Sequence, residues 1–557
     1  MGLFLLDYGA GNVQSLANSL DKLGHRFTWI SSAEDFNTAT SLVFPGVGAF
    51  GHAIEGLTSR GLLEPLREYI RSGKPYYGIC IGMQVLFQCS AESDVKGLGI
   101  IPGPITRFDD ADKAVPHIGW NTADLFDADA SNSSEGTDRP EHYYFVHSFR
   151  ATYDPIAYPD AASWAHTTTQ YGQEVFMASV RKGNVFGTQF HPEKSGDAGL
   201  KLLDAWLSQP ESQRAVAPPT PRQVRLPQRA GGLTKRIIAC MDVRANDQGD
   251  LVVTKGDQYD VRDNSATATA ETAGAVRNLG KPVSLAARYY ESGADELCLL
   301  NITSFRHSPL QDQPMLAVVR AAAGCVFVPL TIGGGIKDSV DPDGTKRSAL
   351  EVAGAYFRAG ADKVSIGSEA VYAVEKLRAR GGSGDGTSAI ETIARAYGRQ
   401  AVVVSIDPRR VYVDPETYEG PYAAELVRGR ADGPAHERGR AWWYQCTVSG
   451  GREARPLSVL QLAQGVETLG AGEILLNSID RDGTGLGFDL DLVRLVKDNV
   501  RVPVVASSGA GGKEHFVEVF GATKVEAALA AGIFHREEVS IQEVKEEMKA
   551  KGIATRI

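Results

Sequence analysis

Short apolar runs alternate with amphipathic stretches along most of this chain. In residues 1–207 the apolar runs LFLLDYG, TSLVFPGVG, PYYGICIG and NVFGTQFHPE are separated by helix-like stretches such as VQSLANSLDKLG. This alternation predicts an α/β sheet covered by helices. Over residues 208–232 five prolines and several charges replace the apolar periodicity, which is typical of a linker. We therefore expect an α/β domain, a linker, and a second domain over residues 233–557.

The second domain repeats a short apolar run followed by a helical pattern. Its eight candidate strands are RIIACMDV, DELCLL, VFVPLTI, DKVSI, AVVVSID, EILLNSI, VPVVASS and VEAALAA. Eight such units predict a closed (β/α)8 barrel. TIGGGI with RAGADKVSIGSEAV resembles VVASSGAGG with GATKVEAALAAGIF about half a barrel later, which indicates two related half-barrels. The polar segment 413–451 contains the run Trp442-Trp443-Tyr444 and is expected to form a small structure of its own.

Composition narrows the class of protein. Lysine and arginine total 58 against 68 acidic residues, a net charge of −10, so the chain as a whole gives no electrostatic signal for nucleic acid or an anionic membrane. The 43% hydrophobic and 23% charged residues are globular usage. Six cysteines without a CxxC pair exclude a disulfide framework and a zinc signature. No run reaches the roughly 18 apolar residues of a membrane helix, so we expect a soluble, cytoplasmic protein without metal or cofactor.

The segment Gly78-Ile79-Cys80-Ile81-Gly82 lies between an apolar run and a helical run. This G-x-C-x-G pattern is typical of a nucleophile elbow, in which flanking glycines permit a strained turn that projects the central side chain. A cysteine at a helix N-terminus has its thiolate stabilised by the helix dipole. A buried structural cysteine is an equally good interpretation of this segment alone.

Two further segments add to this candidate site. Phe190-His191-Pro192-Glu193 follows about 110 residues later, and residues two apart on an extended strand share a face, so Glu193 can orient the His191 ring. With Cys80 they make a nucleophile, a base and an orienting carboxylate. Pro45-Gly46-Val47-Gly48 ends another apolar run, and the N–H groups of Val47 and Ile81 are candidates for an oxyanion hole. A plain turn explains that run nearly as well.

These motifs resemble those of the class I glutamine amidotransferases. The segments DYGAGN, PGVG, VPHIGWN and YFVHS also resemble the glutaminase subunit of the imidazole glycerol phosphate synthases, over most of residues 2–207. The resemblance implies that Cys80, His191 and Glu193 hydrolyse glutamine through a glutamyl thioester and release ammonia. It also implies that Gln84, just after the elbow, helps to bind glutamine.

The second domain carries two aspartates at equivalent places in the expected barrel. Asp242 ends the first candidate strand and Asp407 ends the fifth, so their carboxylates are expected on opposite sides of one barrel mouth. Such a pair can serve as general acid and general base if its surroundings separate the two pKa values. Capping of the following loop or helix is the other interpretation of each aspartate.

Small residues follow four of the expected strands, in the segments Gly333-Gly334-Gly335, Gly367-Ser368, Ser508-Gly509-Ala510-Gly511 and Ala531-Gly532. Neighbouring pairs of these segments can aim backbone N–H groups and a helix N-terminus at a phosphate. Two such cradles on opposite sides indicate a substrate with a phosphate at each end. For any single segment, a structural turn is an equally good interpretation.

KRIIACMDVR, LVVTKGDQYD, TIGGGI, ADKVSIG, VVSIDPRR and LLNSIDRDGTGLGFD resemble the cyclase subunit of the same synthases, so the whole chain resembles their fused, eukaryotic-type form. This resemblance implies a class I glutaminase α/β domain followed by a (β/α)8 TIM barrel. The implied reaction joins ammonia to a bisphosphorylated ribulosyl-formimino carboxamide ribonucleotide, giving imidazole glycerol phosphate and an aminoimidazole carboxamide ribotide. Asp242 and Asp407 are then the acid/base pair, with Lys255 and Asp482 assisting. Ser508 replaces the family's usual glycine, and Gly367-Ser368 an Asn-Thr type of turn.

Charged residues begin four of the expected strands, and these are Arg236, Glu296, Lys363 and Glu473. If they point inward, charges of both signs meet at the barrel bottom, and the resemblance implies that this ring gates ammonia. Solvent-facing charges at the lower rim are the other interpretation, slightly favoured by these residues alone. Both domains on one chain favour the gate, because ammonia loses its nucleophilicity when it is protonated in water.

We therefore expect a bifunctional enzyme that binds glutamine and a bisphosphorylated nucleotide-like substrate, with an interface between its own two domains. One alternative is a phosphosugar isomerase-type barrel with a regulatory glutaminase-like module. Another is a metabolite-sensing scaffold without turnover. Neither nucleic acid nor a membrane is expected as a partner.

Overall fold

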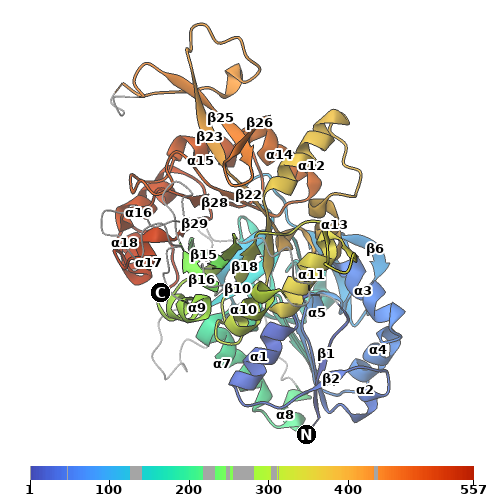
Figure 1. The fold of residues 1–557 in the computed structure, drawn as a ribbon. Coiled ribbons are helices and arrows are strands. Elements are labelled where there is room, and N and C mark those ends of the chain that lie inside the picture. The colour runs from blue at the N-terminus through green and yellow to red at the C-terminus, as the bar shows by residue number, and fades with distance from the viewer. Residues whose placement is uncertain are drawn as a thin grey trace.

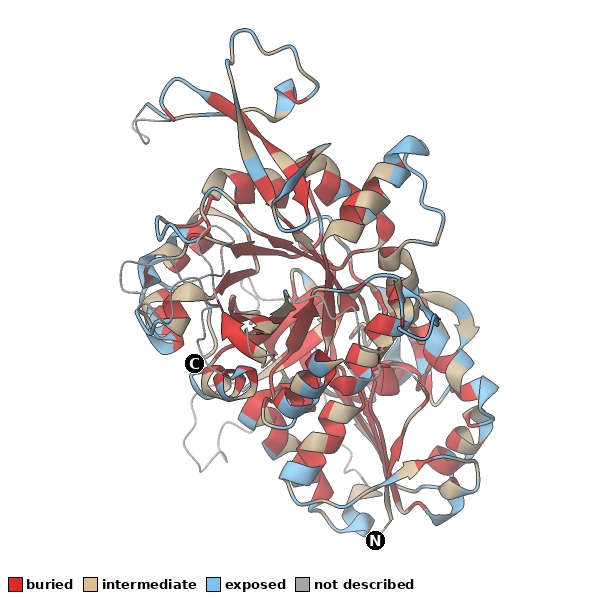
Figure 2. Ribbon diagram, in the orientation of Figure 1, coloured by how far each residue is buried: buried red, intermediate tan, exposed pale blue. Residues whose placement is uncertain are grey.

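The computed structural model describes residues 2–9, 11–46, 48–125, 141–216, 232–245, 251–254, 281–302, 310, 313–431 and 437–557. An N-terminal sheet domain lies against a barrel, and a β-extension projects from the barrel on the side away from the N-terminal domain (Figure 1). In both parts the central strands are buried, whereas the outward faces of the helices are exposed (Figure 2).

The described residues of the N-terminal domain form an eight-stranded sheet in the order β2-β1-β3-β4-β14-β13-β12-β9, parallel over its first five strands. These strands are β1 (Leu3–Leu6), β2 (Thr28–Ile30), β3 (Ser41–Phe44), β4 (Tyr76–Ile79), β9 (Asp124–Leu125), β12 (Ala165–Tyr171), β13 (Glu174–Lys182) and β14 (Val185–Thr188). Smaller sheets contain β5 (Phe87–Ser90), β6 (Ser93–Lys96), β7 (Ile101–Arg107) and β11 (Phe149–Arg150), and the pair β8 (His117–Thr122) and β10 (His142–His147).

Alternate side chains of this sheet pack on two layers of helices. Leu5 and Val43 pack with α1 and α7, whereas Leu6 and Phe44 pack with α3 and α4 on the other face. The helices of this domain are α1 (Gln14–Lys22), α2 (Asp35–Thr38), α3 (Phe50–Ser59), α4 (Leu63–Arg71), α5 (Ile81–Gln84), α6 (Pro159–Ala162), α7 (Gly196–Leu207) and α8 (Glu211–Arg214). The α/β sheet predicted for this part of the chain is confirmed.

The second domain is a closed barrel, as predicted. In the part of the chain that the structure describes, eight parallel strands follow one another in sequence order, and the last pairs with the first. Seven of them are β15 (Arg236–Ala245), β17 (Glu296–Asn301), β21 (Lys363–Ile366), β22 (Val402–Ile406), β27 (Glu473–Leu476), β28 (Val504–Ser507) and β29 (Ala527–Ala530). The eighth, β18 (Leu330–Gly333), starts later than the run VFVPLTI predicted, because Pro329 has no N–H to donate to the sheet.

Helices surround the barrel and their ends follow local sequence signals. Ser348, Ser388, Ser458 and Ser540 each begin a helix with a capping box. The helices are α9 (Pro282–Glu291), α10 (Pro314–Ala323), α11 (Ala349–Ala359), α12 (Ser368–Ala379), α13 (Ala389–Tyr397), α14 (Val459–Leu469), α15 (Leu490–Lys497), α16 (Lys513–Ala522), α17 (Gly532–His535) and α18 (Ile541–Ala550). β16 (Leu251–Thr254) pairs antiparallel with β15.

The segment that follows β22 forms the β-extension. Its antiparallel strands are β23 (Pro408–Val413), β24 (Val427–Arg428), β25 (Ala441–Val448) and β26 (Glu453–Ser458). The small structure expected for residues 413–451 is thus present, and Trp442 and Tyr444 are buried within it. Its tip projects well beyond the barrel helices (Figure 1).

The N-terminal domain is bonded to residues that precede the barrel strands. Lys194 pairs with Asp362 at 2.8 Å, and the N–H of Gly196 donates to the carbonyl of Phe327 at 2.9 Å. The indole N–H of Trp120 donates to the carbonyl of Asp295 at 3.1 Å. Because these barrel residues lie just before β21, β18 and β17, the N-terminal domain covers the amino-terminal end of the barrel. Among the described residues, no helix is long and apolar enough to cross a bilayer.

Two histidines are buried together in the N-terminal domain. His117 and His147 are cross-strand partners on β8 and β10, with 3.2 Å between Nδ1 of the first and Nε2 of the second. The ring of Tyr171 stacks on His117 with centroids 4.3 Å apart. Burial lowers the pKa of His147 to about 3 and that of His117 well below its ordinary value. Both rings are therefore neutral in the folded protein at neutral pH.

This pair predicts a loss of stability in mild acid. Because both folded-state pKa values lie below the unfolded value, unfolding takes up two protons as the pH falls below about 6.5, and the unfolding free energy falls by up to about 2.7 kcal/mol per pH unit. The contribution of His147 ends near its folded pKa of about 3. In His117→Gln one of the two protons is lost, so urea unfolding between pH 7 and 5 should show a shallower pH dependence. The control is the exposed His52→Gln, and equal slopes for wild type and His117→Gln would contradict the assignment.

Candidate functional sites at the elbow, the barrel mouth and the barrel foot

Cys80 lies in the strained turn between β4 and α5. Its φ and ψ of 50° and −103° are sparsely populated for a residue with a side chain. A Cβ on Gly78 would approach the carbonyl oxygen of Gly82 to 2.3 Å, and a Cβ on Gly82 would approach that of Phe44 to 2.3 Å. The two glycines therefore allow the close backbone packing that holds Cys80 in this conformation. This is the geometry of a nucleophile elbow.

His191 and Glu193 lie together beside the elbow. The 2.8 Å contact between His191 Nδ1 and Glu193 Oε1 is buried. Glu193 reaches the ring from a 3-10 turn over Pro192–Lys194, and not from the extended strand that the spacing predicted. The fixed φ of Pro192 suits the first position of such a turn. The two side chains still meet, because the turn brings residue i+2 back over residue i.

The electrostatics of His191 favour its protonated form. Burial by itself lowers the pKa of His191, but the Glu193 carboxylate and then the Cys80 sulfur raise it, leaving it well above its ordinary value. The influence of Cys80 on this pKa indicates that the sulfur lies near the ring. A cysteine beside a histidine that Glu193 orients is therefore the arrangement that these residues form.

The neighbours of this site hold it in place. The amide of Gln189 donates to Cys80 Sγ at 3.4 Å. The amide of Gln84 is buried and donates to Gln189 Oε1 and to the carbonyl of Phe149, both at 2.9 Å. Ile81 is buried, and a Cβ on Gly46 would lie 1.9 Å from its Cγ2, so the segment after β3 packs on the elbow. Val47 lies outside the described residues.

Asp242 and Asp407 lie on opposite sides of the barrel mouth. Asp242 is on β15 and Asp407 follows β22, and these strands are four apart in the closed order. The amide of Asn477 donates to Asp407 Oδ1 at 2.6 Å. Asp482 is mostly buried in the loop after β27. Lys255 lies outside the described residues.

The small residues after the strands take up conformations that favour glycine. Gly334, Gly335 and Gly509 have positive φ, and Cβ atoms on Gly334, Gly509 and Gly511 would lie 2.0–2.2 Å from backbone oxygens. Ser508 also has a positive φ of 74°, a backbone conformation that favours glycine. Gly367 precedes α12, and the Ser368 hydroxyl accepts a hydrogen bond from the N–H of Ser449 at 3.0 Å. Because the hydroxyl accepts this bond, its own O–H can still donate to a phosphate.

Four charges meet at the foot of the barrel, inside it. Lys363 Nζ lies 2.5 Å from Glu296 Oε1 and 2.6 Å from Glu473 Oε2. Arg236 lies 2.8 Å from Glu296 and also pairs with Glu473, so the two cations and two carboxylates alternate in a closed ring. No side chain of the ring is more than 2% exposed. This excludes the solvent-facing interpretation of these residues.

The ring lies beneath the N-terminal domain. Tyr144 of β10 is buried, and its carbonyl accepts a hydrogen bond from the N–H of His191 at 2.9 Å. Burial raises the pKa of the Tyr144 hydroxyl, and Glu296 and Glu473 raise it further. Tyr144 therefore lies between the histidine of the elbow site and the charged ring.

Several residues of these sites were missed by the sequence analysis. Gln189 could have been found, because it lies two residues before His191 and shares its face on an extended segment. Asn477 could have been found in the same way, because it lies two residues after an inward-facing position of β27. Arg410 and its partner Asp489 gave no such signal, since they are 79 residues apart in the sequence. Only the folded chain brings them together.

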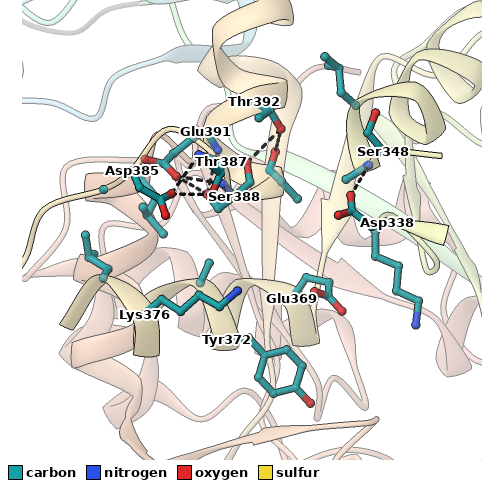
Figure 3. A pocket seen from close by; sticks show the side chains of 18 of the residues that line it. Asp338, Ser348, Glu369, Tyr372, Lys376, Asp385, Thr387, Ser388, Glu391 and Thr392 are labelled. Atoms are coloured by element: carbon teal, nitrogen blue, oxygen red, sulfur yellow. Dashed lines mark hydrogen bonds between the residues drawn. The ribbon is translucent and has the colours of Figure 1, made fainter. Parts of the chain in front are cut away.

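A separate cavity of about 350 Å3 lies on the outside of the barrel between α11, α12 and α13 (Figure 3). The described residues that line it include none of the predicted site residues. Its polar groups serve local structure, since Ser388 and Glu391 form the capping box of α13 and Arg380 pairs with Asp385. The cavity is therefore separate from both the elbow and the barrel mouth.

Comparison with known proteins agrees with this division. Residues 4–207 match the family described as glutamine amidotransferase class-I, and residues 236–540 match the family described as histidine biosynthesis protein. The chain is 51% identical over 555 residues to the imidazole glycerol phosphate synthase hisHF of Emericella nidulans, covering 99% of this chain and 98% of the relative. It is 50% identical to that of Schizosaccharomyces pombe, covering 99% of each, and 52% identical to the chloroplastic one of Arabidopsis thaliana, covering 99% and 89%.

Fold, sites and relatives together define an enzyme in which a class I glutamine amidotransferase domain precedes a (β/α)8 barrel cyclase domain. The chain belongs to the imidazole glycerol phosphate synthase hisHF family of histidine biosynthesis.

The buried ring predicts that its charges are interdependent. In Lys363→Met the carboxylates of Glu296 and Glu473 keep only Arg236 as a common partner, so the unfolding free energy should fall by about 3–5 kcal/mol, the usual effect of leaving a buried charge unpaired. Urea unfolding measures the change. The exposed Lys337→Met is the control, and equal stability of the two variants would contradict the buried ring.

Proposed function

We propose that the chain hydrolyses glutamine at the elbow, passes the ammonia through the barrel, and consumes it at the barrel mouth. The proposal rests chiefly on the position of the N-terminal domain over the foot of the barrel, with the aspartate pair at the opposite end. If the barrel interior joins the two sites, ammonia can pass from one to the other without release into water.

At the elbow, the Cys80 thiolate attacks the carboxamide carbon of glutamine. The charged tetrahedral intermediate is stabilised by N–H donors, for which Ile81 and Val47 remain the candidates. The imidazolium of His191 gives its proton to the departing nitrogen, so ammonia leaves and a glutamyl thioester remains. His191 then takes a proton from water as the water attacks the thioester. This step releases glutamate and restores the Cys80 thiolate and the His191 imidazolium. Glu193 keeps the ring oriented throughout.

Ammonia then crosses the charged ring and the apolar interior of the barrel. Above the ring, a cluster of inward apolar side chains lines much of the interior, and it contains Ile238, Cys240, Cys298, Val403, Leu475, Val505 and Leu529. Such a lining disfavours ammonium, because burying an unpaired charge is costly, and favours neutral ammonia. The ring would act as the gate between the two domains.

At the mouth, ammonia meets the bisphosphorylated ribulosyl-formimino aminoimidazole carboxamide ribonucleotide. One cradle, Gly334-Gly335 with Gly367-Ser368, would hold one phosphate, and Gly509 with Gly511 the other. Asp242 and Asp407 act as acid and base while the imidazole ring closes and the carboxamide ribotide departs, with Lys255 and Asp482 assisting. A cytoplasmic location stays a prediction, since the name of the Arabidopsis relative places that protein in the chloroplast.

The separation of roles predicts a selective loss in Cys80→Ala. Glutamine-dependent formation of imidazole glycerol phosphate should fall by about a thousandfold or more, because the nucleophile is absent. Synthesis from ammonium salts at alkaline pH, where ammonia is neutral, should stay within about twofold of wild type. Steady-state assay of both reactions on one preparation measures this.

The exposed Cys89→Ala serves as the matched control and should behave as wild type in both assays. Loss of the ammonia-driven reaction in Cys80→Ala would refute the separation of roles. Wild-type protein that hydrolyses no glutamine, even with the bisphosphate bound, would favour the regulatory module instead.

A further inference from the structure

One buried arginine ties the β-extension to the barrel mouth. The side chain of Arg410, on β23, is only 4% exposed. Its Nη2 and Nε lie 2.9 and 3.2 Å from Asp489 Oδ2, and its Nη1 lies 2.6 Å from Glu437 Oε1. The guanidinium also lies 4.3 Å from the centroid of the Trp442 ring. The two carboxylates and the aromatic face compensate the burial of this cation.

Asp489 is the second member of the network and ends the loop after β27. It accepts a hydrogen bond from the Tyr444 hydroxyl at 2.9 Å and from the Ser478 hydroxyl at 3.3 Å. It also caps α15 by accepting the N–H of Leu492 at 3.3 Å. Asp489 thus joins the extension, the start of the loop 477–489, and the helix that follows it.

The backbone beside Arg410 holds the same loop. The N–H of Arg410 donates to Asp480 Oδ2 at 2.8 Å, and the N–H of Ile479 donates to the carbonyl of Pro408 at 3.2 Å. The loop 477–489 is therefore fixed at both of its ends to the strand that directly follows Asp407.

Both carboxylates that we place at this side of the mouth depend on these segments. Asp407 accepts the Asn477 amide at 2.6 Å, and its carbonyl accepts the Thr447 hydroxyl of β25 at 2.6 Å. Asp482 lies within the loop, with its N–H donating to the carbonyl of Ser478 at 2.9 Å. A shift of the loop would move Asn477 and Asp482 relative to Asp407.

We propose that Arg410, acting through Asp489 and Tyr444, is a positioning residue for the barrel reaction, because it fixes the loop of Asp482 against the strand end that carries Asp407. This inference rests on the proposed function. The inner end of the β-extension then holds the loop 477–489 in position at the barrel mouth. We expect this inner end to matter more to catalysis than the exposed tip. Small misplacements of catalytic groups reduce rates strongly.

The test compares Arg410→Met with Arg440→Met in the full chain. Arg440 is exposed on the same extension, and its guanidinium lies 5.7 Å from the Tyr412 ring centroid, away from the loop. With ammonium salts and the bisphosphorylated ribonucleotide, kcat should fall at least about tenfold in Arg410→Met and stay within about twofold in Arg440→Met. KM should change less than kcat, and glutamine hydrolysis should persist. Arg410→Lys should recover only part of the rate, because an ammonium cannot bridge both carboxylates as the guanidinium fork does.

Tyr444→Phe removes a single hydroxyl and decides the question if Arg410→Met does not fold. Loosening the loop weakens the hydrogen bond from Asn477 to the Asp407 carboxylate, so kcat should fall and the kcat–pH profile should change. An unchanged profile, with kcat equal to that of Arg440→Met, overturns the proposal. So does an activity loss in Arg410→Met that merely follows the folded fraction measured by circular dichroism. Absence of ammonia-driven turnover in the wild type would instead refute the proposed function itself.

Discussion

The alternating ring of Arg236, Glu296, Lys363 and Glu473 is the interaction on which the rest of the molecule depends. Four charges without solvent are tolerable only because each has partners of opposite sign within hydrogen-bonding distance. The ring closes the foot of the barrel with polar groups. The apolar interior of the barrel lies above the ring, and the amidotransferase domain lies below it. A purely apolar plug would fill the same space without offering a polar small molecule any partner.

The direction of parallel strands explains why the two sites lie in series. Cys80 follows the carboxyl end of β4, and Asp242 and Asp407 lie at the carboxyl ends of barrel strands, as is general for parallel sheets. Because the N-terminal domain turns the edge that carries Cys80 toward the amino-terminal end of the barrel, the elbow lies at one end of the barrel and the aspartate pair at the other. The positions of the two sites therefore follow from the direction of the parallel strands and from the way the two domains pack together.

The predictable features were those set by local periodicity. Apolar runs located the barrel strands, and counting them placed Asp242 and Asp407 across the mouth. The turn at Pro192 was not anticipated, since a proline is compatible with both a strand end and a 3-10 turn. The start of β18 depended on the missing N–H of Pro329. The partners of Arg410 and Gln84 come from distant segments, so no short-range pattern in the sequence encodes them. Val47 and Lys255 stay predictions.

The segment that joins the two domains limits how far they can move apart. The residues just before β15 are bonded on both sides, with the N–H of Thr234 donating to the carbonyl of Trp120 at 2.9 Å and that of Lys235 to the carbonyl of Ala554 at 2.8 Å. This leaves the joint little freedom to swing open. A single chain carries the two domains in a one-to-one ratio, and dilution cannot separate them. An organism with this chain needs no matched expression of two genes.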